Sequence, residues 1–128
     1  MKDTTSRILT GISEGIYKEK GSKFIAYAMP ITSKEEVKEI VNRYKKEHHK
    51  AKHVCFAYRI GQDIRANDNG EPSGTAGRPI LRQIDAAGLD NTLVVVVRYF
   101  GGTLLGTGGL INAYKTAAQD AIKNGLTN

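Results

Sequence analysis

The residues best suited to chemistry lie in two glycine-rich stretches on either side of an apolar run. Nine of the fourteen glycines fall between Gly70 and Gly109, and each stretch precedes a segment with helical spacing. Backbone N–H groups at the start of a helix attract phosphate or carboxylate, and glycine lets a ligand approach them closely. An alternative interpretation is that these glycines only turn the chain and allow close packing. The candidate ligand-binding positions are Gly74, Thr75, Gly77, Gly101, Gly102, Thr107 and Gly108.

Three arginines could bring guanidinium groups to the same anion. Arg98 ends the apolar run, and Arg78 and Arg82 belong to the segment after the first glycine-rich stretch. Because the two stretches leave neighbouring elements, we expect the three arginines to converge on one cleft, where each could bind phosphate through its planar fork. For each arginine taken alone, the alternative is a solvated or structural ion pair. The stretches are neither a Walker A loop nor a dinucleotide fingerprint, since the residues after Gly106-Thr107-Gly108 fit neither pattern.

Polar side chains near the first stretch offer further candidates for the cleft. Asp68 and Glu71 could hold a magnesium–phosphate group, although Asp68-Asn69-Gly70-Glu71-Pro72 is also typical of an ordinary turn. His53 and Cys55 are two residues apart in a predicted strand and so share a face, which is compatible with a Cys–His nucleophile. A small buried thiol is the alternative for Cys55. We therefore keep His53, Asp68 and Glu71 as polar candidates and assign no catalytic residue, no metal site and no cofactor.

Basic residues outnumber acidic residues in the chain, most clearly in one segment. Lysine and arginine exceed aspartate and glutamate by 19 to 13, which gives a net charge of +6. Five lysines and arginines and all three histidines fall between Arg43 and His53. A phosphate backbone would bind such a segment with strong salt dependence. The alternative is a solubilising helix end, because lysines favour helix C-termini.

The elements that must position these residues follow from hydrophobic spacing. The sequence predicts a hairpin within about 10–31, helices over about 34–48, from Pro79 to Gly88 and from Leu110 to a stop at Gly125, and strands over 54–60 and 92–100, with a loop over 66–77. The helix at 34–48 carries a capping box, Ser33 with Glu36. The run at 92–100 does not alternate, so we expect a central strand covered on both faces. This order predicts an α/β or α+β sandwich with helices covering one face of a sheet.

Length and composition favour a single domain over residues 1–128. The longest apolar run, Leu93 to Val97, is too short to span a bilayer, and Met1 to Ser6 lacks the apolar stretch of a signal peptide. The single cysteine cannot form an internal disulfide. We therefore expect a soluble, cytoplasmic protein that does not act at a membrane.

Three blocks together resemble the IMPACT family, whose bacterial members include YigZ-like proteins. They run from Gly70 to Leu81, from Val95 to Gly102 and from Leu105 to Leu110, and the strand from His53 to Arg59 adds to them. The resemblance implies an α+β domain with the ribosomal protein S-five domain 2-like fold, a sheet with helices packed on one face. Bacterial relatives carry a ferredoxin-like C-terminal domain that we expect to be absent here, and eukaryotic relatives regulate translation by binding a ribosome-associated activator.

Charge, loop placement and resemblance together predict a translation-associated regulatory binding domain. In this interpretation, the glycine-rich, arginine-lined cleft binds RNA or nucleotide phosphate, and RNA or a ribosome-associated factor is the partner. One alternative is an enzyme acting on a small phosphorylated or carboxylated substrate, with Asp68 or Glu71 holding a metal or acting as base. Another is a protein-interaction module. We favour the non-enzymatic function.

Overall fold

A hairpin comes first in the order of strands and helices. The structure, a computed structural model, describes residues 7–126, so the Met1 to Ser6 stretch lies outside it. β1 (Ser13–Glu19) pairs antiparallel with β2 (Ser22–Pro30), and φ is positive at both Lys20 and Gly21 between them. Positive φ at both central residues is the type I′ turn, whose twist suits paired strands. The predicted hairpin is confirmed.

The first helix, α1 (Lys34–Glu47), begins where the capping box predicts. The Ser33 Oγ accepts the Glu36 amide at 3.3 Å, and the Glu36 carboxylate accepts the amide of Thr32 at 2.8 Å. The first bond satisfies an N–H group that the helix itself leaves without a partner, and the second holds Thr32, the residue before the N-cap, against the first turn.

The remaining elements differ from the prediction at several boundaries. They are β3 (His53–Ile60), β4 (Asp63–Asn67), α2 (Gly77–Ala86), β5 (Thr92–Tyr99) and α3 (Gly106–Leu126). The sequence analysis missed β4 because its residues are mostly exposed and show no apolar alternation. Gly125 was wrongly predicted as a stop: α3 continues through it, and a Cβ there would lie 2.6 Å from the Ser13 Oγ. This glycine brings the helix close to β1.

The strands form one antiparallel sheet in the order β1-β2-β5-β3-β4. β5 is central, as its apolar run predicts, and its side chains alternate between two cores. Val94 and Val96 pack with α2 and α3, whereas Leu93, Val95 and Val97 pack with α1. The α+β class is confirmed.

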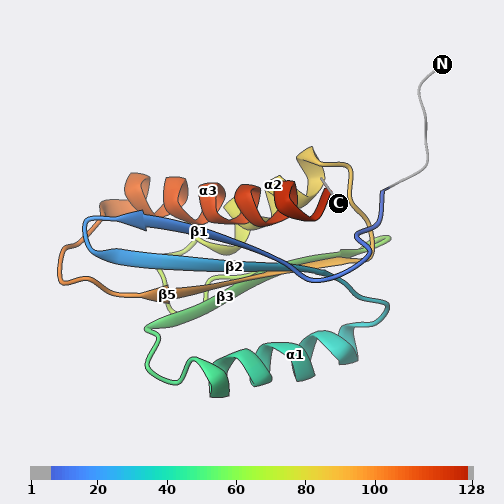
Figure 1. Cartoon of the computed structure of the whole chain (residues 1–128), viewed down its shortest axis with the longest axis horizontal. Helices are drawn as coiled ribbons and strands as arrows, with labels where there is room; N and C mark the ends of the chain where they lie inside the picture. Colours follow the sequence, from blue (N-terminus) through green and yellow to red (C-terminus); the bar gives the residue numbers. More distant parts are fainter. Residues whose placement is uncertain (1–6, 127–128) are drawn as a thin grey trace.

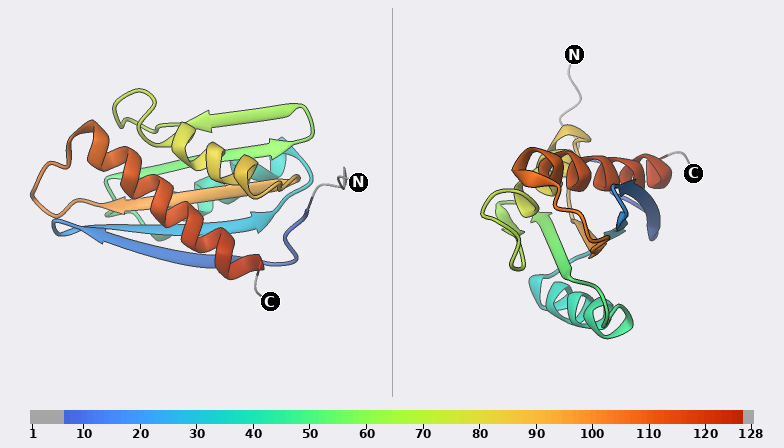
Figure 2. Two further views of the ribbon diagram at one scale, coloured as in Figure 1. Left: turned by 90° about the horizontal axis from the view of Figure 1, so that it is seen from above. Right: turned by 90° about the vertical axis from the view of Figure 1, so that its left-hand side faces the viewer.

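The helices lie on both faces of the sheet, which corrects the expected arrangement on one face. Figures 1 and 2 show α2 and α3 together above the sheet and α1 alone below it. The reason is the apolar stripe of α1, whose Val37 and Val41 are buried against the second face. No helix within residues 7–126 is long and apolar enough to cross a membrane.

Candidate functional site

Asp68 organises the first glycine-rich loop. Its carboxylate accepts the amides of Gly74 at 2.8 Å, Ala76 at 3.1 Å and Gly77 at 2.8 Å. Burial alone would raise the pKa of Asp68, but these three amides, helped by the charge of Arg78, outweigh it and lower that pKa. The start of α2 therefore already holds an anion, the chain's own carboxylate.

Two other candidates of this loop serve its folding. The Thr75 Oγ1 donates to the Pro72 carbonyl at 2.6 Å, and the Thr75 amide donates to the same oxygen at 3.1 Å. Gly77 packs directly on β4, because a Cβ there would lie 2.5 Å from the Asn67 nitrogen. Both positions support the packing interpretation of the first loop.

The second glycine-rich loop connects β5 to α3 and leaves the first turn of that helix exposed. Gly101 packs on the β1–β2 turn, where a Cβ would lie 2.0 Å from the Gly21 carbonyl carbon, and its amide donates to the Ser22 Oγ at 3.2 Å. Gly102 has a φ of 89°, which favours glycine. Thr107 and Gly108 are exposed in the first turn of α3. The second loop, unlike the first, presents the start of its helix to the surface.

A pocket of about 270 Å³ joins the two loops. The β3, β5 and α3 elements contribute to its wall, together with residues of both loops. The lining residues are Lys52, His53, Glu71, Pro72, Arg98, Phe100, Leu104, Leu105, Gly106, Thr107 and Leu110. The structure thus brings His53, Glu71, Arg98 and Thr107, four of the predicted candidates, into one cavity.

A buried ion pair lies in the wall of this pocket. The Arg98 Nη1 donates to both Glu71 oxygens, at 2.9 and 2.7 Å, and both side chains are at most 5% exposed. The Tyr114 hydroxyl donates to the Glu71 Oε2 at 2.5 Å, and the His53 Nε2 lies 3.5 Å from the Oε1. Glu71 therefore connects the first loop to β5, α3 and β3.

The guanidinium of Arg98 retains a buried donor that the ion pair does not use. Its Nε is buried and has no hydrogen-bond partner among residues 7–126. The guanidinium also lies 5.6 Å from the ring centres of both Phe24 and Phe100, within the range of cation–π attraction. A buried donor without a partner is unusual in folded proteins and marks this side chain for a functional explanation.

Cys55 contacts Tyr114, which bonds to Glu71 of the ion pair, and Cys55 is poorly suited to act as a nucleophile. Its Sγ donates to the Asp68 carbonyl at 3.1 Å and lies 3.4 Å from the Tyr114 hydroxyl. Burial raises the pKa of Cys55 to about 12, so the reactive thiolate is scarce at neutral pH. The same burial raises the pKa of Tyr114. His53 faces the Asn69 carbonyl through its Nδ1, at 2.7 Å.

The three arginines do not meet. Arg98 is buried in the pocket wall, whereas Arg78 and Arg82 are exposed on α2 and are not among the residues that line the pocket. A helix that begins at Gly77 places these two one turn apart on its own surface. Among residues 7–126 no group of three His, Cys, Asp or Glu side chains is arranged to hold a metal ion.

Comparison with known proteins identifies the family of this chain. The sequence model of the Impact N-terminal domain matches residues 20–122. The chain belongs to the Impact N-terminal domain family. This confirms the resemblance carried by the three glycine-containing blocks.

Relatives of this Impact N-terminal domain include two bacterial proteins. The IMPACT family member YvyE of Bacillus subtilis (strain 168) is 42% identical over 106 residues, 80% of this chain and 49% of that protein. An IMPACT family member of Thermus thermophilus is 47% identical over 102 residues, 80% of this chain and 55% of that protein. The chain thus spans about half the length of these relatives.

Two solved structures are similar to the Impact N-terminal domain described here. A crystal structure of a hypothetical protein has a TM-score of 0.87 at 37% identity, covering 91% of this chain and 59% of that one. The structure of the two-domain translational regulator Yih1 has a TM-score of 0.59 at 27% identity, covering all of this chain and 52% of that one.

The structure adds residues that the sequence analysis did not assign to the site. Tyr114 reads as a core position of an amphipathic helix, and nothing in the sequence signals that its hydroxyl bonds to a carboxylate. Lys52 was part of the basic segment, but its Nζ lies 5.0 Å from the Phe100 ring centre at the pocket. Phe100 and Leu104 are 42% and 82% exposed. Large exposed apolar side chains can mark a binding site, but the sequence alone does not show that they are exposed.

Proposed function

We propose that this Impact N-terminal domain is the regulatory binding part of a translation-associated protein, and that its pocket binds a phosphate group of RNA or of a nucleotide. The translational role is supported by the likeness to Yih1, a two-domain translational regulator. The phosphate is supported by one observation, the buried Arg98 with an unused Nε in the wall of a pocket that opens at the start of α3.

The chemistry of the pocket suits an anion held at its mouth. Thr107 supplies a hydroxyl in the first turn of α3, where the helix dipole and free amides favour negative charge. Lys52 adds a second cation beside Arg98, and Glu71 offsets one of the two charges. Glu71 also fixes the guanidinium through two hydrogen bonds, so little conformational entropy is lost when a ligand arrives.

Cations beyond the pocket favour RNA over an isolated nucleotide. The β1–β2 turn packs on Gly101 of the second loop, and Lys18, Lys20 and Lys23 surround that turn. Figure 1 shows the β1–β2 turn, the β5–α3 connection and the α1–β3 connection at the same end of the molecule. A nucleic-acid strand that places one phosphate in the pocket can continue over these lysines, and Phe100 offers an exposed ring for base stacking.

Binding of a labelled single-stranded RNA across a salt series tests the proposal. We expect measurable affinity at low ionic strength that falls as salt rises, and Lys52→Glu should reduce the slope of log K against log salt by about 0.7 per lost phosphate contact. Lys115→Glu, an equal charge change at an exposed position of α3, serves as control and should change the affinity less. Absence of RNA binding at low ionic strength would contradict RNA as the ligand.

Thermal shift with nucleotides tests whether the bound phosphate belongs to a nucleotide rather than to RNA. A nucleotide that occupies the pocket stabilises the domain by mass action, by about 2.7 kcal/mol at a hundredfold excess over its dissociation constant. A shift with ATP or AMP that Lys52→Glu abolishes, without RNA binding, assigns the pocket to nucleotides. No RNA binding and no nucleotide shift together would overturn the phosphate proposal.

An enzyme is the second candidate, favoured by one contact. The His53 Nε2 lies 3.5 Å from the Glu71 Oε1 within the same pocket, which places an acid–base pair beside a cation. The substrate would be small and phosphorylated or carboxylated. Conversion of such a substrate that His53→Gln abolishes, while the folded state is retained, would favour the enzyme over the binding domain.

A further inference from the structure

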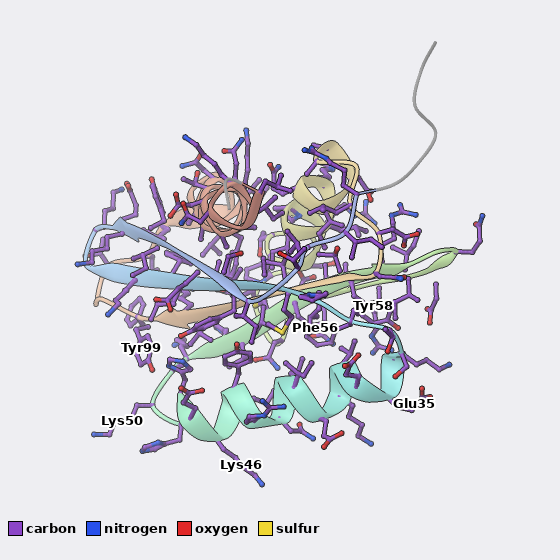
Figure 3. All side chains as sticks on the ribbon, turned by 45° about the vertical axis from the view of Figure 1, so that its right-hand side comes forward. Glu35, Lys46, Lys50, Phe56, Tyr58 and Tyr99 are labelled. Atoms are coloured by element: carbon purple, nitrogen blue, oxygen red, sulfur yellow. The ribbon has the colours of Figure 1, made fainter. Side chains whose placement is uncertain are left out.

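A second cavity, separate from the glycine-rich loops, runs between α1 and the last two strands of the sheet. It has a volume of about 470 Å³, and its apolar part consists of Val37 and Val41 of α1 and Phe56 and Tyr58 of β3. Figure 3 shows Phe56 and Tyr58 on the side of the sheet that faces α1, with Glu35 near the beginning of that helix. We call this cavity the α1–β4 groove.

The walls of the α1–β4 groove carry an excess of positive charge. Lys34, Lys38 and Lys45 of α1 and Arg65 of β4 line it, against one carboxylate, Glu35, and all five side chains are exposed. The lining charges therefore sum to 4 − 1 = +3. Lys34 and Lys38 are four residues apart, so they lie on one side of the helix, about 6 Å apart along its axis.

β4 forms an edge of the sheet with main-chain groups that no other strand uses. It is last in the strand order and, within the described residues 7–126, pairs only with β3. Ile60 and Asp63 flank the two-residue turn and form its closing pair, so in an antiparallel ladder the N–H and C=O groups of Ile64 and Ala66 point away from β3. Ile64 is also 41% exposed, a large apolar side chain on an open edge. Such an edge is a template for a further strand.

We propose that the α1–β4 groove and the β4 edge together bind an extended acidic segment of a partner protein, which adds a sixth strand beside β4. The main chain of the segment pairs with Ile64 and Ala66, its apolar side chains cover Ile64, and its carboxylates face Arg65 and the lysines of α1. Alternate side chains of a strand point to the same face and are about 6.8 Å apart, which is close to the spacing of Lys34 and Lys38.

The groove suits a peptide better than a nucleic acid. Tyr58 is only 4% exposed and its hydroxyl donates to the Asp63 carboxylate at 3.3 Å, so its ring offers no face on which a base could stack. A peptide, by contrast, gains main-chain hydrogen bonds at β4, and strand addition at an exposed edge is a recurring mode of peptide recognition.

Titration with a fluorescent peptide of alternating glutamate and valine tests this proposal on the whole chain. We expect saturable binding, and we expect the amide resonances of Ile64 and Ala66 to shift and to become protected from exchange. Lys34→Glu combined with Lys38→Glu should weaken binding by about tenfold or more, because two attractions become repulsions. Lys115→Glu with Lys123→Glu, an equal change on α3, should weaken binding much less.

Two further peptides separate the charge from the strand pairing. Replacing glutamate by lysine in the peptide should abolish binding, and N-methylation at alternate residues, which removes the donors for β4, should weaken it while leaving its charge unchanged. The proposal is overturned if the Ile64 and Ala66 resonances stay unmoved up to about 1 mM peptide, if both double variants lose affinity equally, or if only single-stranded RNA competes for Lys34 and Lys38.

Discussion

Arg98→Met tests the buried ion pair at the centre of the candidate site. The substitution keeps an unbranched side chain of similar length but leaves the Glu71 carboxylate, 3% exposed, with its Tyr114 hydrogen bond and without its cation. Removing one partner of a buried pair costs about 3–5 kcal/mol, because the remaining charge is buried and uncompensated. For a domain of this length, that loss lowers the melting temperature by roughly 10–20 °C.

Urea unfolding followed by circular dichroism measures this loss, with two comparisons. Arg82→Met removes an exposed guanidinium from α2 and should change the free energy of unfolding by no more than about 0.5 kcal/mol. Adding Glu71→Gln to Arg98→Met removes the stranded charge, so the double variant should be more stable than Arg98→Met alone. A loss below about 1 kcal/mol for Arg98→Met, or a double variant that shows the sum of the two single losses, would refute the view that Glu71 and Arg98 depend on each other.

Three further predictions follow from the loops and the core. Asp68→Asn should lower the free energy of unfolding by about 2 kcal/mol at pH 7. Because folding lowers the pKa of Asp68 from its ordinary 3.8, the stability difference between the wild type and this variant should disappear as the pH falls below that value. Urea unfolding from pH 7 to pH 2 measures this. Ellman's reagent at pH 8 should modify Cys55 much more slowly in the native protein than in urea, since the Cys55 thiol is buried and burial raises its pKa; similar rates would contradict this. Gly101→Ala should destabilise the domain by about 1–3 kcal/mol, because the added Cβ would lie 2.0 Å from the Gly21 backbone. Gly108→Ala has open space around it and should stabilise α3 by about 0.5–1 kcal/mol. Equal effects of the two substitutions in calorimetry would count against the packing of Gly101 on the β1–β2 turn.

Local patterns predicted the elements whose stability is local or strongly apolar. Ser33 and Glu36 indicate where α1 begins because their hydrogen bonds span only a few residues. The apolar run of β5 indicates a strand buried on both faces. β4 could not be found in this way, because it forms through its pairing with β3 and leaves most of its own side chains in water.

The candidate site was predictable in part, and the limit has a physical reason. Glycine clustering pointed to both loops, and the structure joins them at one pocket. Residue types could not show that the Asp68 carboxylate accepts the amides of the first loop. Nor could they show that Glu71 pairs with Arg98, because these two residues are 27 positions apart in the sequence. Arg78 and Arg82 are exposed on α2 and do not line the pocket, and spacing along the sequence does not reveal which cleft a helix faces.

The two proposed surfaces share a strand but differ in the face they use, which fixes how they should interact. β3 contributes His53 to the phosphate pocket and Phe56 to the α1–β4 groove. The pocket opens where α3 begins, and the groove lies against α1 on the opposite face of the sheet, as Figure 2 shows for the two helices. Neither surface needs the other to move, because Glu71 already fixes Arg98 and β4 is already an edge. RNA and an acidic peptide should therefore bind at the same time with nearly additive free energies. The double variant Lys34→Glu with Lys38→Glu should then weaken the binding of the peptide far more than the binding of RNA.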